Sequence, residues 1–382
     1  MSPVYLDCNA SNPIDPRVLQ AMLDAYRLLP GNAGSPHVHG HNAKDAVHGA
    51  RDRIGRVVGA KRNEVFFTSG ATESNNLAIL GLAQYGLASG KRHIVSSAIE
   101  HKAVLEPLER MRSWGFEVTL VEPQGDGRIR SEDLIDSIRT DTLLVSLMHA
   151  NNETGVIQPI FQVARAAEDR GVWLHVDAAQ GFGRDLEPLA HPGIASISIS
   201  GHKIFGPQGI GALILRRQRK DGPVLEPVFV GGGQELGLRS GTLAVPLIVG
   251  LGLAAELALQ EHATRKEACE RIGRIVIDWA ESHGGQIHGS AQYRMPHVLN
   301  VSFPGWDADD LLESVRESIS ISDGAACTSV CATASHVLSA MGLGEPQLSG
   351  AVRLSWSHQT DQAALVEALA AAGRVIAARR SV

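Results

Sequence analysis

The residue whose type and setting most clearly suggest chemistry is Lys203, which stands in a turn between two apolar segments. Residues 196–215 read SISISGHKIFGPQGIGALIL, and the outer parts are apolar and β-branched, as in short buried strands. The turn is rich in glycine, which lets a backbone approach a ligand closely. A lysine here is either an ordinary solvated charge or an amine that forms an imine with an aldehyde cofactor. In the second case, Ser200 and His202 could hold a phosphate of that cofactor.

A second motif, TSGATE, follows the apolar segment EVFF and opens a helix. Gly70, Ala71 and Thr72 offer backbone N–H groups and a hydroxyl at the place where a phosphate binds to a helix N-terminus. The same pattern also describes a plain capped helix, so this motif alone leaves both interpretations open.

Three further motifs could contact a heteroaromatic ring. In HVDAAQ, Asp177 could pair with a protonated pyridine nitrogen and Gln180 could donate to a ring oxygen. In SSAIEH, His101 could stack on the ring and move protons, and in HANNETG, Asn152 follows another apolar segment. Each has a structural alternative: a helix cap for Asp177, a turn for Asn152 and a structural role for His101.

These motifs can form one site only if the fold brings distant segments together. Strand and helix patterns alternate up to about residue 245, which predicts an α/β fold with a mostly parallel sheet and helices on both faces. Ligands bind beyond the carboxyl ends of the strands in such sheets. The expected strands are EVFFTS, HIVSS, FEVTLVE, TLLVSLMH, VWLHVDA, IASISIS and GALIL. The expected helices cover 43–59 and 71–86, a segment from 102, EDLIDSIR, PIFQVARAAEDRG and one long helix over 245–276.

Composition limits the classes of protein that need to be considered. The chain has 382 residues and a formal net charge of -6, and LRRQRK at 215–220 is its one short basic run, so direct nucleic-acid binding is not expected. No apolar stretch is long enough to span a bilayer and no signal peptide is evident, which predicts a cytoplasmic protein without membrane partners. Four scattered cysteines form no C-x-x-C pair, and no metal site is expected.

The order of these motifs is more specific than any one of them, and the chain resembles the cysteine desulfurases of the NifS and IscS type, within the class V aminotransferases. The resemblance is carried by YLDCNAS, GNAGSPHVHGHNA, FTSGATESNNLAI, EHKAVL, SLMHANNETGVIQPI, HVDAAQ, SGHKIFGPQGIGAL, GGGQELGLRSGTLAV, SDGAACTS, SHVLSAMGL and AVRLSW. It implies the aspartate aminotransferase-like fold of pyridoxal-phosphate transferases, with a seven-stranded sheet. The large cofactor-binding domain would cover 15–260, and a small α+β domain with the catalytic cysteine loop would cover 1–14 and 261–382.

The resemblance also implies roles for individual residues. Lys203 would bind pyridoxal 5'-phosphate, His101 would assist proton transfer, and Cys327 would be the nucleophile that takes sulfur from L-cysteine as a persulfide and leaves L-alanine. Arg353 would bind the substrate carboxylate, with Asn152 near the substrate or the ring oxygen. The implied cofactor-binding residues are Ala71, Thr72, His101, Asn152, Asp177, Gln180, Ser200, His202, Lys203 and Thr242. Thr242 would reach in from a second subunit, which implies a homodimer.

The sequence departs from the family pattern at several places. Cys8, Ser11 and Asn12 stand where asparagine and two threonines are usual, and Cys331 is an additional thiol. His37, His39 and His41 alternate as metal ligands on a strand could, but the neighbouring glycines predict a loop. In these departures the sequence resembles the DndA branch of the family, which serves DNA phosphorothioation, more than the branch that supplies iron–sulfur clusters. The alternatives are a sulfur donor for iron–sulfur clusters or tRNA thiolation, a selenocysteine lyase, an aminotransferase, or a non-catalytic docking protein on the same fold.

Overall fold

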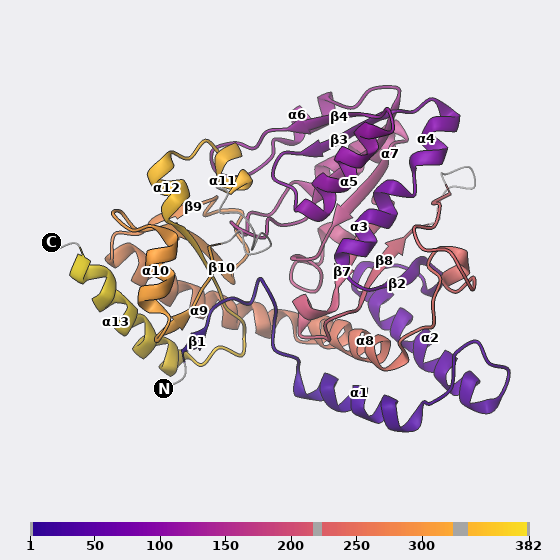
Figure 1. Cartoon of the computed structure of the whole chain (residues 1–382), viewed down its shortest axis with the longest axis horizontal. Helices are drawn as coiled ribbons and strands as arrows, with labels where there is room; N and C mark the ends of the chain where they lie inside the picture. Colours follow the sequence, from indigo (N-terminus) through magenta and orange to yellow (C-terminus); the bar gives the residue numbers. More distant parts are fainter. Residues whose placement is uncertain (1–2, 217–223, 324–334, 380–382) are drawn as a thin grey trace.

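A seven-stranded sheet forms the centre of the molecule. The computed structural model describes residues 3–216, 224–323 and 335–379 of the chain (Figure 1). The sheet has the strand order β2-β8-β7-β6-β5-β3-β4, and β8 is its one antiparallel strand. The strands are β2 (Val65–Thr68), β3 (His93–Ser97), β4 (Glu117–Val121), β5 (Thr142–Met148), β6 (Trp173–Asp177), β7 (Ser196–Ser200) and β8 (Gly211–Leu215). The expected α/β fold with a mostly parallel, seven-stranded sheet is confirmed.

Helices cover both faces of this sheet because neighbouring residues of each strand point to opposite faces. Phe66, Ile94 and Leu213 pack in one core cluster with α3 (Ala71–Leu80), α4 (Ala83–Ser89) and α5 (Lys102–Ser113). The residues next to them in the strands pack in the opposite cluster with α1, α2, α7 and α8. The bounds of these helices and of α6 are α1 (Pro16–Leu28), α2 (Val38–Val58), α6 (Ser131–Asp136), α7 (Ile160–Arg170) and α8 (Val245–Gln260).

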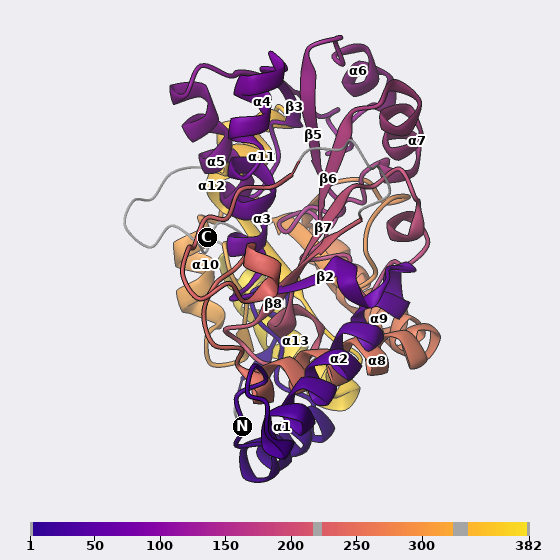
Figure 2. The same cartoon turned by 90° about the vertical axis from the view of Figure 1, so that its right-hand side faces the viewer.

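The C-terminal part forms a second, smaller sheet with a core of its own. In this sheet β10 (Val298–Ser302) pairs antiparallel with both β9 (Gln286–His288) and β12 (Ala351–Ser355). The helices of this part are α9 (His262–Ser282), α10 (Ala308–Val315), α11 (His336–Ala340), α12 (Glu345–Gly350) and α13 (Gln362–Arg379). The N-terminal strand β1 (Val4–Tyr5) pairs with β11 (Ile319–Ser320), so both ends of the chain lie in this part (Figures 1 and 2).

Three helix predictions were wrong in their boundaries. The expected helix over 71–86 ends at Leu80, and α4 begins at Ala83 after a turn at Gly81. The expected long helix over 245–276 is two helices, α8 and α9, that meet at Glu261. α2 begins at Val38, so His39 and His41 lie in its first turn and not in a loop. His37 caps this helix by accepting a hydrogen bond from the Gly40 N–H at 3.2 Å. The loop was predicted because the neighbouring glycines disfavour a helix, but this cap lets the helix begin among them.

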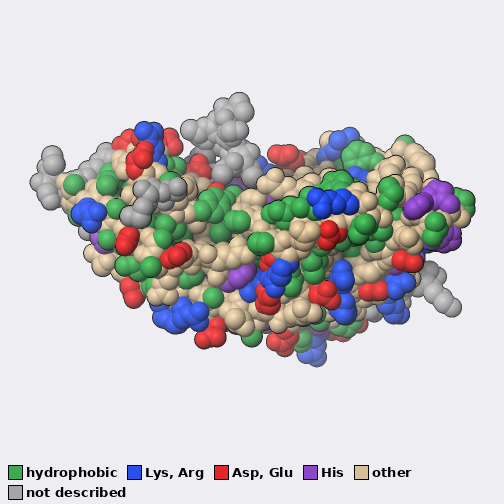
Figure 3. Space-filling model, turned by 90° about the horizontal axis from the view of Figure 1, so that it is seen from below, with side chains coloured by type: hydrophobic (Ala, Val, Ile, Leu, Met, Phe, Trp, Pro, Cys, Tyr) green, Lys and Arg blue, Asp and Glu red, His purple; other side chains and the backbone are tan. Residues whose placement is uncertain are grey.

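The outer surface carries mixed side chains. On the face seen from below, where α1 lies, hydrophobic side chains alternate with acidic and basic ones (Figure 3). Tyr26 and Leu28 at the end of α1 are among the exposed hydrophobic residues. Within the described parts of the chain, no helix combines the length and the apolar character that crossing a membrane requires.

Candidate active site

One cavity of about 1010 Å³ lies at the carboxyl ends of the central strands and brings nearly all the expected site residues together. The expected residues that line it are Ala71, Thr72, His101, Asn152, Asp177, Gln180, Ser200, His202, Lys203 and Arg353. All except Arg353 come from β2, β3, β5, β6 and β7 or from the segments that directly follow these strands. The parallel strands therefore deliver these side chains to the same edge of the sheet.

Lys203 lies in a single turn of 3-10 helix, η3 (Gly201–Ile204), that directly follows β7. Its Nζ donates to the carbonyl oxygens of Asn9 and Ala10, the latter at 3.0 Å. Asn12 Nδ2 donates to the Lys203 carbonyl at 3.0 Å, so the N-terminal segment holds both the backbone and the amine of Lys203. A lysine amine with two carbonyl partners inside a cavity is not an ordinary solvated charge, which removes the structural alternative for this residue.

Asp177 is buried at the end of β6 and held in place by Asn75, a residue of α3 that the sequence did not indicate. Asn75 Nδ2 donates to Asp177 Oδ2 at 2.7 Å, and Asn75 Oδ1 lies 3.0 Å from His175 Nε2. Burial lowers the pKa of His175 to about 4, so its imidazole is neutral and Nε2 can donate to Asn75. The chain of hydrogen bonds presents a fixed carboxylate to the cavity, as a protonated pyridine nitrogen requires.

The phosphate-binding motif depends on a close approach between strand β8 and the start of helix α3. A Cβ atom at Gly211, the first residue of β8, would lie 2.6 Å from the Gly70 Cα, so only glycine lets β8 approach the start of α3. Ala71 and Thr72 in the first turn of α3 then line the same cavity as Ser200 and His202. Burial lowers the pKa of His202 to about 4, which leaves a neutral ring that can donate a hydrogen bond to a phosphate.

Gln180 provides a direct test of whether these residues fit pyridoxal 5'-phosphate. Its Nε2, the group expected to donate to a ring oxygen, donates instead to the Asn9 carbonyl at 3.1 Å, and its buried Oε1 has no hydrogen-bond partner among the described residues. An unsatisfied buried oxygen on the wall of a cavity is a hydrogen-bond acceptor for a bound group. With the Asp177 carboxylate, the helix start at Ala71 and the Lys203 amine on the same wall, the residues fit an aromatic aldehyde phosphate.

His101 lies at the junction of β3 and α5, where it caps the helix. Its Nδ1 accepts a hydrogen bond from the Ala103 N–H at 3.1 Å, which fixes the orientation of the ring at the cavity. The preceding Glu100 is fully buried: its Oε1 accepts from Ser97 Oγ at 2.6 Å and from the Met148 N–H at 2.9 Å. Burial raises the pKa of Glu100 to about 8, so this carboxyl group is protonated at neutral pH.

Arg353 enters the cavity from β12, in the C-terminal part. Its Nη2 forms an ion pair with Asp7 Oδ1 at 2.6 Å, and its Nη1 donates to the Asn152 carbonyl at 3.1 Å. The guanidinium is thereby held beside Glu153, a buried carboxyl group on the cavity wall. Burial raises the pKa of Glu153 to about 7, and its Oε2 accepts a hydrogen bond from Ser335 Oγ. An arginine fixed in this way can bind a carboxylate with two parallel hydrogen bonds.

Two expected residues are not part of this cavity as described. Cys327 lies in 324–334, outside the described residues, and so does Cys331. Thr242 is exposed and does not line the cavity of its own chain. Asn9, Asn75 and Glu153 line the cavity although the sequence analysis missed them. For Asn75 the available signal was a polar residue on the apolar face of a helix that begins with a phosphate motif.

The fold and the site define a class of protein: the chain belongs to the class V aminotransferase family, whose model matches residues 4–368, and enzymes of this family use pyridoxal 5'-phosphate. Within this class, the chain is similar to proteins named cysteine desulfurase IscS. That of Anaeromyxobacter dehalogenans is 43% identical over 355 residues, which are 92% of this chain and 87% of the relative. That of Azotobacter vinelandii is 40% identical over 365 residues, covering 94% of this chain and 89% of the relative.

Two solved structures extend the comparison to the fold. A NifS-like protein has a TM-score of 0.91 and 34% identity, covering 98% of this chain and 99% of that one. DndA from Streptomyces lividans has a TM-score of 0.81 and 46% identity, covering 91% of this chain and 98% of that one. The similarity therefore extends over both the large sheet and the C-terminal part.

Proposed function

We propose that this protein is a pyridoxal-phosphate-dependent cysteine desulfurase that converts L-cysteine to L-alanine and keeps the sulfur as a persulfide on Cys327. The observation that carries the proposal is the meeting of Lys203, Asp177 and Arg353 on one cavity, although they belong to three distant segments. The similarity to the IscS relatives over more than nine-tenths of the chain supports the choice of cysteine as substrate.

When bound, pyridoxal 5'-phosphate joins through its aldehyde to the amine of Lys203 or of the substrate and withdraws electrons from the substrate carbons. Arg353 binds the carboxylate of cysteine and orients it. Lys203 Nζ and the His101 ring both line the cavity and can move a proton at the substrate Cα. The Cys327 thiolate attacks the substrate Sγ; an S–S bond forms, the Cβ–Sγ bond breaks, and the carbon fragment is protonated to alanine.

Cys327 is assigned as the nucleophile from its sequence motif and from the small number of residues that separate it from a residue lining the cavity. Ser335, eight residues after Cys327, lines the cavity and donates to Glu153. Eight residues span at most about 28 Å, which is ample reach for a side chain to enter the site.

The proposal is tested by mixing the purified protein with L-cysteine and a reducing thiol and measuring alanine and sulfide. Both products should form with the native protein, and Cys327→Ser should keep the visible absorption of the cofactor but stop turnover. Cys331→Ser is the matched control, since it removes a thiol from the same segment. Sustained alanine formation by Cys327→Ser would show that Cys327 is not the nucleophile. A 2-oxo acid formed from cysteine without sulfide would point to aminotransfer, and a strong preference for selenocysteine would favour the lyase.

For the sulfur acceptor, we infer DNA phosphorothioation as the pathway, supported by 46% identity to DndA from S. lividans against 40–43% to the IscS relatives. The acceptor would then be a protein of that pathway. Deletion of the gene should abolish phosphorothioate dinucleotides in digested DNA, detected by mass spectrometry, and leave iron–sulfur enzymes active. The reverse result would assign the protein to cluster assembly. A cytoplasmic location remains a prediction.

We infer that the working molecule is a homodimer in which Thr242 completes the phosphate site of the partner subunit. Thr242 is exposed and lies apart from its own cavity, and the same segment exposes Val230 by 82% and Leu236 by 73%. Glu235 and Leu236 both have positive φ, and the buried Glu235 is held by an ion pair with Arg51. A strained, anchored loop that presents apolar side chains is typical of a protein interface.

A further inference from the structure

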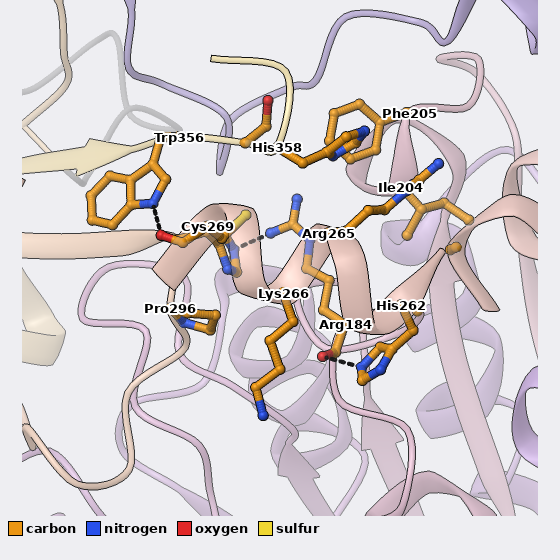
Figure 4. Close-up of a pocket in the computed structure, with 14 residues that line it drawn as sticks. Arg184, Ile204, Phe205, His262, Arg265, Lys266, Cys269, Pro296, Trp356 and His358 are labelled. Carbon is orange, nitrogen blue, oxygen red and sulfur yellow. Dashed lines mark hydrogen bonds between the residues drawn. The ribbon is translucent and has the colours of Figure 1, made fainter. Parts of the chain in front are cut away.

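A second, smaller cavity lies on the other side of Lys203 from the active site, between the large sheet and the C-terminal part. Its volume is about 40 Å³, and Figure 4 shows the side chains around it. Basic and aromatic residues from α9 and from the segments that directly follow η3 and β12 surround it, together with Arg184 and the Cys269 thiol. The dashed lines in Figure 4 include the bonds from His262 to the Arg184 carbonyl and from Trp356 to the Cys269 carbonyl.

Arg184 carries the charge that this cavity leaves uncompensated. Its guanidinium donates to His297 Nε2 and, at 2.8 Å, to the Lys203 carbonyl, and both of these acceptors are neutral. Within the described parts of the chain, no carboxylate lies within ion-pairing distance of Arg184. The nearby carboxylates are engaged elsewhere: Asp185 with His149 at 2.9 Å and Glu261 with Arg265 at 2.8 Å. A partly buried charge without a counter-charge is unfavourable.

The two thiols near Arg184 do not supply the missing negative charge. Burial raises the pKa values of Cys8 and Cys269 to about 11, so both thiols are protonated at neutral pH. Burial lowers the pKa of Arg184, but a guanidinium stays protonated in proteins. Arg265 also lines the cavity, but Glu261 and Asp15 pair with its charge, and the Lys266 amine points away from the cavity (Figure 4).

We propose that this cavity is a binding site for one small monovalent anion of about the size of chloride, held by Arg184. A space of about 40 Å³ exceeds the roughly 10–15 Å³ that one water needs, and it is too small for a phosphate ester or an amino acid. The buried side chains of Ile204, Phe205 and Trp356 line the cavity with apolar surface, and a less polar surrounding strengthens the attraction between the anion and the guanidinium.

The anion would act on the segment that carries the catalytic lysine. Arg184 Nη2 holds the Lys203 carbonyl, and Ile204 and Phe205, which follow Lys203 in the chain, line the cavity. A ligand bound to Arg184 therefore stabilises the turn η3 in the folded state only, so the melting temperature should rise with anion concentration. This inference does not depend on the reaction proposed for the active site.

The direct test is a crystal of the holoenzyme grown in sodium bromide, since bromide replaces chloride and scatters anomalously. An anomalous peak within hydrogen-bonding distance of the Arg184 guanidinium is expected. A cavity that contains only water in these crystals would overturn the proposal.

A thermal test with variants makes the assignment specific. The holoenzyme is melted at constant ionic strength while gluconate, which is too large for the cavity, is replaced by chloride or bromide. We expect a saturable rise of about 1–3 °C. Arg184→Gln removes the charge and Cys269→Met fills the space, so both variants should lose the rise in melting temperature. Arg112→Gln, which changes an exposed arginine paired with Glu109, should keep it. A rise that persists in both cavity variants would place the anion effect elsewhere and overturn the proposal.

Discussion

At the scale of single residues, the position of the Lys203 amine is fixed by the carbonyl groups that accept its hydrogen bonds. Asn9 and Ala10 accept from Nζ, and Asn12 and Arg184 hold the Lys203 backbone carbonyl. The amine is therefore positioned before any substrate arrives, which reduces the entropy cost of reaction.

Lys203→Ala should lose the covalent bond to the cofactor, because no other described lysine amine is held at this position. The expected result is loss of the visible absorption band of the purified protein and no cofactor retained after borohydride reduction and denaturation. Lys44→Ala, on the exposed side of α2, is the control and should stay yellow. An unchanged band in Lys203→Ala would disprove the assignment.

Asn75 links His175 to Asp177, and its removal leaves buried polar atoms without partners. Asn75→Ala should lower the free energy of unfolding by about 2 kcal/mol and weaken cofactor retention, because the Asp177 carboxylate loses its support. Urea unfolding and cofactor release during dialysis measure the two effects. Asn76→Ala, at the next residue of α3, removes one hydrogen bond to the Thr72 carbonyl at the surface. It should change the free energy of unfolding by no more than about 0.5 kcal/mol and leave cofactor release unchanged.

At the scale of elements, the neutral carboxyl group of Glu100 ties the β3–α5 junction to the end of β5. Burial raises its pKa from 4.5 to about 8, and its Oε2 has no partner among the described residues. Between these two pH values the folded state binds one more proton than the unfolded chain. The contribution of Glu100 to the free energy of unfolding therefore falls as the pH rises from about 4.5 to about 8.

Glu100→Gln keeps the acceptor oxygen and cannot ionise, so it should remove this pH dependence. Relative to the native protein, the variant should gain about 3.5 kcal/mol in the free energy of unfolding between pH 5 and pH 8, measured in urea. Glu109→Gln, at an exposed residue of α5, should give a curve parallel to that of the native protein. If the Glu100→Gln curve is also parallel, the carboxyl group is ionised in the folded state and the argument fails.

At the scale of the whole molecule, the exposed loop around Leu236 predicts how two copies associate. Leu236→Asp places a charge on the inferred interface, so the protein should sediment as a monomer in analytical ultracentrifugation. Cofactor affinity should fall as well, because Thr242 can no longer reach the partner's site. Tyr26→Asp changes an exposed apolar residue on α1 and should leave the dimer intact. A monomeric native protein with full cofactor occupancy would contradict the dimer.

The division into two domains, 15–260 and 1–14 with 261–382, remains a prediction, although the packing supports it. Leu6, Trp279 and Trp356 share a core with the C-terminal helices, apart from the two clusters that cover the large sheet. The break between α8 and α9 at Glu261 lies at the proposed boundary.

The sequence alone determined the strands, the sheet type and the residues at the strand ends. HIVSS and GALIL coincide with β3 and β8, because short β-branched runs between turn residues have few alternatives to a buried strand. The same alternation of strands and helices required a parallel sheet, and the parallel sheet placed Lys203, Asp177 and His101 at one edge.

Only the tertiary structure decided which neighbours complete the site. Asn75 lies opposite Asp177, and Asp7 lies opposite Arg353, although about 100 and 346 residues of chain separate the partners. Local patterns report how a segment folds but carry no signal about contacts that form only when distant segments pack. For the same reason the uncompensated charge of Arg184 is invisible in the sequence, where Asp185 stands directly beside it.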